Sequence, residues 1–373
     1  MQYKNVCVEA IECALPPEIV TSDELESRLS PLYERLRLPY GRLELMTGIR
    51  ERGLWERGQL PGDQSVVTVN KLVETTGVDR SKVGAFIHAS VCRDYQEPAT
   101  ACDVHRRVGL SQSAFICDVS NACLGLVTGS FLIANMIELG QIEAGIVVGT
   151  ETSRALMETT IAELNANQTL TRQTVKDAFA SLTIGSGSAA ILLVNEKLSK
   201  TGNRFLGGVV RANTNGSALC RSQVDVTAGG RASGQTMSTD SERLLHEGVA
   251  VAAQAFEQFR AEIGLEPSTI DKVFCHQVGK AHQKLLFETL GLDSARNFAT
   301  LPYLGNTGSV ALPTAAALGL ESGFAKSGDK IGLFGIGSGI NVALAAIDWQ
   351  KTLPSSDPIA PEKLARFLAL NQS

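Results

Sequence analysis

The chain has 373 residues, of which 44% are hydrophobic and 20% are charged. This composition is typical of a globular protein with ample material for a core, in one large or two medium domains. The formal net charge is −5 and the sequence holds no basic tail or Lys/Arg block, which argues against nucleic acid as the main partner.

The cysteines and histidines indicate the cellular compartment of the protein and whether it has a metal site. The eight cysteines include no CxxC pair, and the N-terminus lacks the apolar core of a signal peptide, so we expect reduced thiols in the cytoplasm. The five histidines show no metal-ligand spacing such as HExxH, so no metal site is expected. The longest apolar stretch, 330–348, is interrupted by glycines and a serine, which predicts two buried strands rather than a membrane span.

The predicted elements alternate between short apolar strands and helices. In chain order, strands are expected at 5–14, 83–90, 114–119, 145–149, 185–194, 206–212, 272–276, 297–301, 331–335 and 339–347. Helices are expected at 21–36, 63–76, 98–108, 122–139, 153–180, 241–263, 281–290, 309–326 and 361–370. The charged segment 41–62 is expected to be irregular, and the Gly- and Ser-rich segment 222–234 to be a loop. The alternation predicts an α/β protein whose sheet is covered on both faces.

The order of elements repeats once along the chain. A helix, strand, helix, strand, helix and strand follow one another in residues 63–149 and again in 241–335, without repetition of residue identity. We therefore expect two similar halves, 1–200 and 201–350, with a site where they meet, followed by a tail at 351–373.

Cys123 lies at the start of a strong helical pattern. It follows the apolar strand 114–119, and Ser120 and Asn121 are residue types that cap helices. In the first turn of a helix 122–139, free amides and the helix dipole favour a thiolate and lower its pKa. The alternative is a small apolar residue packed in a core, as most buried cysteines are. Position alone leaves both interpretations open.

Two later segments favour the nucleophile. His276 ends a predicted strand, and Asn306 lies in a glycine-flanked loop that opens a helix. Each taken alone is more often a structural histidine or a turn asparagine. In the paired halves, however, both lie at strand ends opposite Cys123, and a Cys, His and Asn that converge are suited to acyl transfer through a thioester. Backbone amides of 335–339, Ser338 among them, and of Cys123 are candidates for an oxyanion hole.

Four short blocks contain these residues: Asn-Ala-Cys at 121–123, His-Gln at 276–277, Gly-Asn-Thr-Gly at 305–308 and Gly-Ile-Gly-Ser-Gly at 335–339. In this order they resemble the signature blocks of the thiolase-fold condensing enzymes, near ketoacyl-ACP synthase III. The resemblance spans about residues 3–349 and implies a five-layered αβαβα sandwich of two related halves, usually a homodimer. It also implies acyl thioester substrates and no cofactor.

A fifth block narrows the family. The segment 90–98 resembles the one that carries an extra glutamate in the OleA-type head-to-head condensing enzymes of bacterial olefin synthesis. The match implies that Glu97 reaches the partner subunit's active site and acts there as a base. Taken alone, Glu97 is more often a solvated residue beside Pro98 at a helix start. The resemblance instead favours the base, because joining two plain acyl thioesters requires removal of an α-proton.

The expected activity is a non-decarboxylative Claisen condensation of two fatty acyl-CoAs to a 2-alkyl-3-ketoacyl product. Cys123 takes the first acyl group, His276 and Asn306 support the thiolate and hold a substrate oxygen, and Glu97 removes the α-proton. Downstream pathway enzymes or an acyl carrier protein are further partners that the resemblance allows. The first alternative is a ketoacyl-ACP synthase III that uses malonyl-ACP. The second is an inactive dimeric scaffold or acyl binder, against which the intact Cys-His-Asn set argues.

Overall fold

The computed structural model describes residues 1–175, 179–226 and 232–371. Its main feature is a nine-stranded mixed sheet in the order β11-β12-β13-β8-β1-β7-β6-β4-β5. The strands are β1 (Val6–Ala14), β4 (Val83–His88), β5 (Phe115–Asp118), β6 (Ala144–Glu151), β7 (Gly187–Asn195), β8 (Arg204–Ala212), β11 (Lys272–Cys275), β12 (Lys330–Gly337) and β13 (Asn341–Asp348).

The sheet consists of two parts that join at β1 and β8. β1 pairs with β7 along its whole length but with β8 only at Cys7 and Arg204, and the residues before β1 add a bridge from Gln2 to Gly207. One part, the first sheet, holds β1, β7, β6, β4 and β5. The other part, the second sheet, holds β8, β13, β12 and β11.

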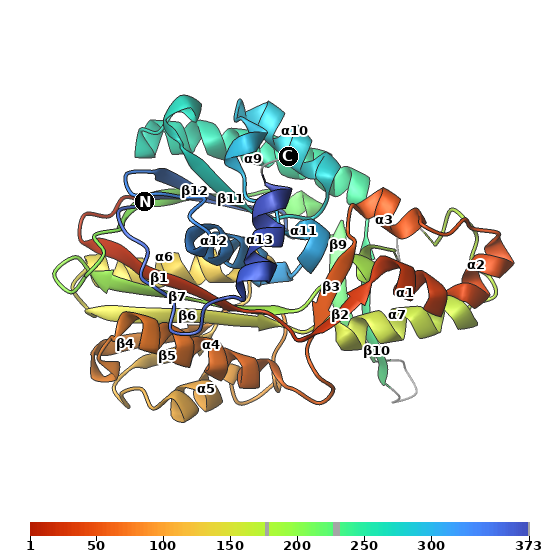
Figure 1. Ribbon diagram of the computed structural model, residues 1–373, viewed down its shortest axis with the longest axis horizontal. Coiled ribbons are helices and arrows are strands. Elements are labelled where there is room, and N and C mark those ends of the chain that lie inside the picture. The colour runs from red at the N-terminus through yellow and green to blue at the C-terminus, as the bar shows by residue number, and fades with distance from the viewer. Residues whose placement is uncertain (176–178, 227–231, 372–373) are drawn as a thin grey trace.

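Helices fill the space between the two sheets and cover both outer faces (Figure 1). α6 (Gly125–Glu138) and α12 (Ala311–Glu321) lie between the sheets. α4 (Pro61–Thr76) and α5 (Thr100–Val108) cover the first sheet, and α9 (Ser241–Ile263) and α10 (Lys280–Leu290) cover the second. The layers alternate as αβαβα, as the resemblance implied.

Three buried clusters correspond to the contacts between these layers. The central cluster joins Phe131 of α6 and Leu318 of α12 to both sheets. One outer cluster holds Val104 of α5 with the first sheet, and the other holds Phe256 of α9 with the second. Each such side chain contributes about 1.5–3 kcal/mol by leaving water, so the layered burial stabilises the fold.

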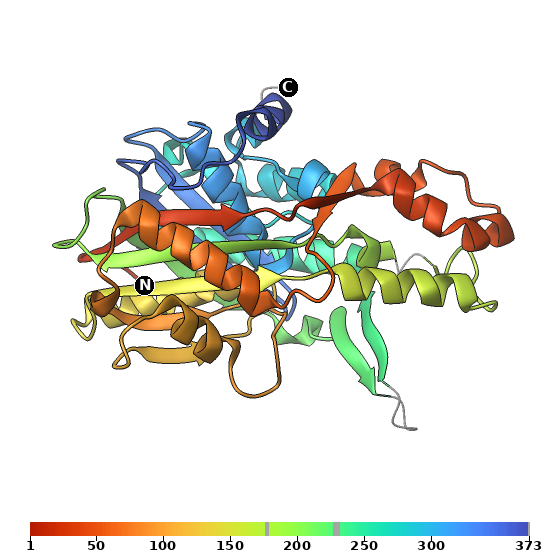
Figure 2. The same cartoon turned by 60° about the horizontal axis from the view of Figure 1, so that its bottom comes forward.

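A smaller unit projects from one end of the sandwich, as Figure 2 shows for α1–α3 in red and α7 in yellow-green. Buried side chains from these helices form a fourth cluster. Its elements are α1 (Ser22–Arg28), α2 (Ser30–Leu36), α3 (Arg42–Thr47), α7 (Arg154–Ala166) and two antiparallel strand pairs, β2 (Glu18–Thr21) with β3 (Glu51–Leu54) and β9 (Cys220–Val226) with β10 (Ala232–Thr239).

Several predicted boundaries agree closely with the structure. α9 and α13 (Pro361–Leu370) have the predicted bounds. Thr21 and Glu24 form the expected capping box, since the Glu24 amide donates to the Thr21 side chain and the Thr21 amide to the Glu24 carboxylate.

Three predictions in the projecting unit were wrong. The helix expected at 21–36 is two helices, because Pro31 near the start of α2 has no amide to continue the first one. The segment 41–62 contains α3 and β3, which are too short for a periodic signal, and β3 is stabilised by a partner strand distant in sequence. In the described part of the segment 153–180, α7 ends at Ala166 and residues 167–175 are not helical, whereas Phe179 and the 3₁₀ turn Ala180–Thr183 are; residues 176–178 lie outside the described part.

Two further predictions failed in the second half. The described parts of 222–234 belong to the paired strands β9 and β10, and residues 227–231 lie outside the described part. No strand forms at 297–301: only Asn297 bridges to Val273. The side chain of Gln277 instead accepts the amides of Thr300 and Leu301. Pairing between segments that are distant in the same chain leaves no local pattern in the sequence.

Candidate active site

Cys123 lies on a tight turn between β5 and α6. Ala122 has a left-handed conformation with φ 45°, and the Leu124 amide donates to the Asn121 carbonyl at 2.9 Å. The helix begins only at Gly125, so the prediction that Cys123 occupies its first turn was wrong. A non-glycine residue in the left-handed region is strained, and strain of this kind is concentrated at functional sites.

The end of β12 contacts Cys123 from the second half. A Cβ placed on Gly337 would lie 3.5 Å from the Cys123 amide nitrogen and 3.6 Å from its Cβ, so the two backbones are close. The backbone amides of Cys123 and Ser338 both act on the Cys123 thiol and lower its pKa. The structure therefore gathers the two amides that were predicted to form an oxyanion hole.

The thiol of Cys123 is protonated at rest. Burial raises its pKa to about 12, and the Glu151 carboxylate adds to this, while the amides of Cys123 and Ser338 act in the opposite direction. The prediction of a lowered pKa was wrong, because burial outweighs those amides. Burial also raises the pKa of Cys13 and Cys275 to about 12, so surroundings rather than acidity distinguish Cys123.

His276 follows the last residue of β11, and its amide donates to the Phe334 carbonyl of β12 at 3.0 Å. The side chain is buried, and neither ring nitrogen has a hydrogen-bond partner among the described residues. Burial, followed by the influence of His282, lowers the pKa of His276 to about 3, so the imidazole is neutral. Because structural buried histidines are normally hydrogen-bonded, two unpaired ring nitrogens favour a functional role.

Asn306 links the two halves through its backbone. Its amide donates to the Thr183 carbonyl, and its carbonyl accepts from the Gly185 amide, both at 2.9 Å. The side-chain Oδ1 accepts from the Gly308 amide at 3.0 Å. That bond fixes the amide group and leaves Nδ2 as a donor to a substrate oxygen.

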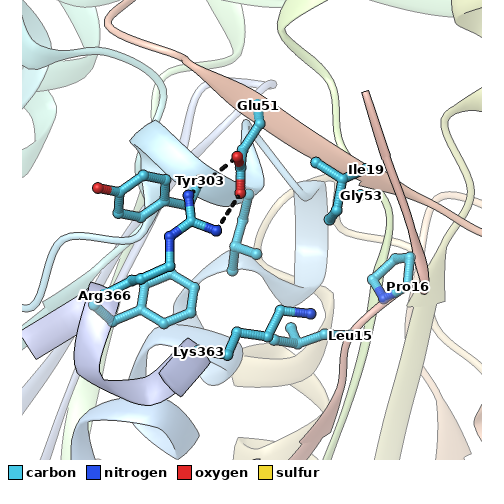
Figure 3. A pocket seen from close by; sticks show the side chains of 10 residues that line it. Leu15, Pro16, Ile19, Glu51, Gly53, Tyr303, Lys363 and Arg366 are labelled. Atoms are coloured by element: carbon cyan, nitrogen blue, oxygen red, sulfur yellow. Dashed lines mark hydrogen bonds and ion pairs between the residues drawn. The ribbon is translucent and has the colours of Figure 1, made fainter. Parts of the chain in front are cut away.

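The segment that leads into Asn306 is braced by the C-terminal helix α13 (Figure 3). The Arg366 guanidinium pairs with Glu51 of β3 at 3.1 Å and lies 4.4 Å from the ring centroid of Tyr303 in α11 (Leu301–Leu304). The hollow in Figure 3 is lined by these three side chains and others, none of which is a predicted site residue. The hollow is therefore separate from the active site, and the tail supports α11.

No hydrogen bond or ion pair joins Glu97 to Cys123 in the described part of the chain. Glu97 lies in the loop between β4 and α5, with an exposed side chain that has no hydrogen bond or ion pair to the described residues. The loop itself is anchored: Asp94 accepts from the Gly62 amide at 2.8 Å, and its own amide donates to Thr100 at 3.1 Å. The Glu97 side chain therefore has no hydrogen-bond partner among the described residues, while hydrogen bonds fix the loop that carries it.

Parts of this chain match two family models, and relatives match nearly all of it. Residues 46–200 match the model for the thiolase N-terminal domain, and residues 261–349 match that for the 3-oxoacyl-ACP synthase III C-terminal domain. A Shewanella oneidensis protein named acyl-CoA:acyl-CoA alkyltransferase is 39% identical over 94% of this chain and 100% of its own length. This chain belongs to the acyl-CoA:acyl-CoA alkyltransferase family.

Other members and more distant relatives agree with this placement. The family member from Xanthomonas campestris is 32% identical over 94% of this chain and all of its own. A solved OleA structure from the same species has a TM-score of 0.88 at 31% identity, covering 94% of this chain and 98% of that chain. A Deinococcus deserti protein named beta-ketoacyl-ACP synthase III is 26% identical. The thiolase fold predicted from the four blocks is confirmed.

One residue near the alkyltransferase site was missed in the sequence. Glu151, the last residue of β6, is a buried carboxylate that raises the pKa of the Cys123 thiol and accepts a hydrogen bond from Ser309. Other strands of the sheet also end in an acidic residue, Asp118 in β5 and Asp348 in β13, so the position of Glu151 in the sequence does not by itself single it out. Within the described residues, no group of three or more His, Cys, Asp or Glu side chains is placed to hold a metal, and no helix is long and apolar enough to cross a membrane.

The buried imidazole of His276 makes the stability of this family member depend on pH. Since the pKa falls from the ordinary 6.5 to about 3 on folding, the unfolded chain binds a proton in that range that the folded chain does not. Above about pH 6.5 His276 is neutral in both states and does not lower the free energy of unfolding. As pH falls from 6.5 toward 3, protonation of His276 in the unfolded chain lowers that free energy. We expect His276→Asn, which cannot titrate, to lose less unfolding free energy than wild type between about pH 7.5 and about pH 5. Denaturant titrations at both pH values test this, and equal losses would contradict it.

Proposed function

We propose that this protein condenses two fatty acyl-CoAs without decarboxylation, giving a 2-alkyl-3-ketoacyl-CoA and free CoA. Family membership supports an acyltransferase, and the amides that act on the Cys123 thiol, together with the unpaired ring nitrogens of His276, support a thioester mechanism. The proposal needs no cofactor beyond the two substrates.

One observation carries the choice of a non-decarboxylative reaction, namely the place of Glu97. Solved OleA variants carry replacements of a cysteine and of a glutamate. In that chain the glutamate precedes the cysteine by the same number of positions that separates Glu97 from Cys123. A synthase that forms its carbanion by loss of CO₂ does not need this carboxylate, whereas condensation of two plain thioesters does.

In the first half-reaction, the sulfur of Cys123 attacks the thioester carbonyl of one acyl-CoA. The amides of Cys123 and Ser338 stabilise the oxyanion, and CoA leaves with the thiol proton. The neutral His276 accepts hydrogen bonds and can receive that proton during the attack.

In the second half-reaction, Glu97 removes an α-proton from the second acyl-CoA. His276 and the Nδ2 group of Asn306 hold the enolate oxygen, the carbanion attacks the acyl-Cys123 carbonyl, and the thiolate leaves. The α-proton taken by Glu97 then returns to the Cys123 thiolate. One C–H bond and one acyl–sulfur bond are broken, and one C–C bond and one S–H bond are formed, so atoms balance with free CoA as the only other product.

We further propose a homodimer in which Glu97 serves the partner's site. β5 is an edge strand of the sheet, and an exposed edge is open to pairing with another chain. Phe115 on β5, with Val91 and Tyr95 on the Glu97 loop, are large apolar residues that are about half exposed. An apolar patch next to an open edge is suited to a second copy, and the same contact carries Glu97 across.

Product analysis tests the proposed function. Incubation with one acyl-CoA and no other substrate is expected to give a product that contains two acyl chains. The alternative, a synthase dependent on malonyl-ACP, is represented among solved structures by the FabH of Xanthomonas oryzae at 32% identity. Formation of a condensed product only after addition of malonyl-ACP would overturn the proposal and favour that alternative.

Loss of His276 or Asn306 is expected to slow condensation by roughly a hundredfold to a thousandfold, since each supplies a separate hydrogen bond to the developing charge. The variants His276→Ala and Asn306→Ala are measured for condensation rate and melting temperature. Full activity in either variant would exclude the assigned role. A rate loss that merely follows a lowered melting temperature would favour a structural role.

A further inference from the structure

Glu151 gathers hydrogen bonds from two segments that are distant in sequence. Its Oε1 accepts the Val91 amide at 3.0 Å, and its Oε2 accepts the Cys92 amide at 3.2 Å. Oε1 also accepts the Ser309 hydroxyl at 2.5 Å and the Ser309 amide at 3.3 Å. One carboxylate thus holds the loop that carries Glu97 and the turn that carries Asn306.

The carboxylate is held by neutral donors. Glu151 is 5% exposed and has no ion pair with a cation among the described residues. Three amides and a hydroxyl therefore take the place of solvent, and hydrogen bonds to a charged group are about twice as strong as neutral ones. Gly308 allows this close approach: a Cβ there would lie 3.2 Å from the Cγ and Cδ of Glu151, and its φ is 58°.

A second buried carboxylate, Glu9, accepts hydrogen bonds from a single loop and serves as a comparison. It accepts the Ser199 hydroxyl at 2.7 Å, the Lys200 amide at 2.9 Å and the Thr201 hydroxyl at 3.1 Å. All its donors belong to one loop, and none adjoins a predicted site residue. Glu151 differs because both of its segments carry predicted catalytic groups.

We propose that Glu151 is a positioning residue that fixes the Glu97 loop and the Asn306 turn in one relative geometry. The inference deepens the proposed function and rests on it for the role of Glu97. In the proposed dimer, the Asn306 of one site and the Glu97 offered to the other site are tied to the same carboxylate. A change in one segment is thereby transmitted to the other site of the dimer.

The variant Glu151→Gln tests this with little change of shape. Glutamine keeps one acceptor oxygen but places an NH₂ group against an amide donor, so at least one segment is released. We expect acylation of Cys123 to stay near the wild-type rate, and kcat for condensation to fall roughly a hundredfold with KM nearly unchanged. Glu9→Gln is the matched control and is expected to condense at the wild-type rate. A wild-type condensation rate in Glu151→Gln would overturn the proposal.

Hydrogen exchange provides a readout independent of turnover. In full-length Glu151→Gln, the amides of Val91, Cys92 and Ser309 are expected to lose protection while those of α9 keep it. Protection retained in both segments would overturn the proposed link. If Glu151→Gln does not fold, Ser309→Ala removes the hydroxyl bond alone, and it is expected to slow condensation and to raise exchange in both segments. Unchanged exchange at Val91 and Cys92 in that variant would equally overturn the proposal.

Two further observations separate this inference from a structural role and from the proposed function itself. Because the Glu151 carboxylate raises the pKa of Cys123, Glu151→Gln is expected to move the pH profile of Cys123 alkylation to lower pH, whereas Glu9→Gln leaves it in place. An unmoved profile would contradict the proximity on which the inference depends. If the wild type condenses only with malonyl-ACP, the proposed function fails, and the exchange result alone decides whether Glu151 joins the two segments.

Discussion

Replacement of Cys123 by alanine is expected to abolish both acylation and condensation, with a rate loss of roughly four orders of magnitude or more. Among the eight cysteines, all of which lie in the described part of the chain, Cys123 alone follows a strained residue and has two backbone amides that lower its pKa. Incubation of the wild type with an acyl-CoA, followed by peptide mapping, is expected to place the acyl group on Cys123.

The matched control for this variant is Cys102→Ala. Cys102 is exposed on α5 and therefore accessible, yet it has no role in the proposed chemistry. Its loss should leave turnover unchanged. Acylation at any cysteine other than Cys123, or undiminished turnover by Cys123→Ala, would contradict the assignment of the nucleophile.

The variant Glu97→Gln is expected to separate the two half-reactions. Acylation of Cys123 requires no α-proton transfer, so it should proceed at the wild-type rate. Condensation should fall by roughly a hundredfold to ten-thousandfold, because the α-proton of an unactivated thioester is weakly acidic and a general base contributes that much. Rapid-quench measurement of the acyl-enzyme, together with product formation, resolves the two steps.

Glu74→Gln serves as the control, since Glu74 is an exposed glutamate on α4. It should acylate and condense as the wild type does. If Glu97→Gln condensed normally, the proposed reaction would lack its base, and the malonyl-dependent alternative would become the better account. If Glu97→Gln failed to acylate, the glutamate would have a role in the first step that the present mechanism does not give it.

Much of the layered core was predictable because its signals are local. The long amphipathic α9 and the apolar strands of both halves have periodic patterns that tertiary contacts reinforce. The short elements α3 and β3 were not predictable. Both are too short for a periodic signal, and β3 is stabilised by pairing with β2. The strand expected at 297–301 failed for the same reason, since the Gln277 side chain takes the place of a backbone partner.

The candidate site shows a similar division. The motifs identified Cys123, His276, Asn306 and Ser338, and the structure places the Ser338 amide at the Cys123 sulfur. The direction of the Cys123 pKa shift was not predictable from position in the chain, because burial depends on packing between the two halves. Glu151 was missed for a related reason: its four hydrogen bonds come from segments that the sequence keeps far apart.

In the proposed dimer, a complete active site is built from two chains, and mixed dimers test this most directly. Glu97→Gln and Cys123→Ala chains carrying different affinity tags are co-expressed, and dimers that carry both tags are isolated, so that subunit pairing is established before the assay. Each variant alone should be inactive in condensation. The mixed dimer should regain activity, because one of its two sites combines the Cys123 of one chain with the Glu97 of the other. Isolated mixed dimers that remain inactive would contradict the account.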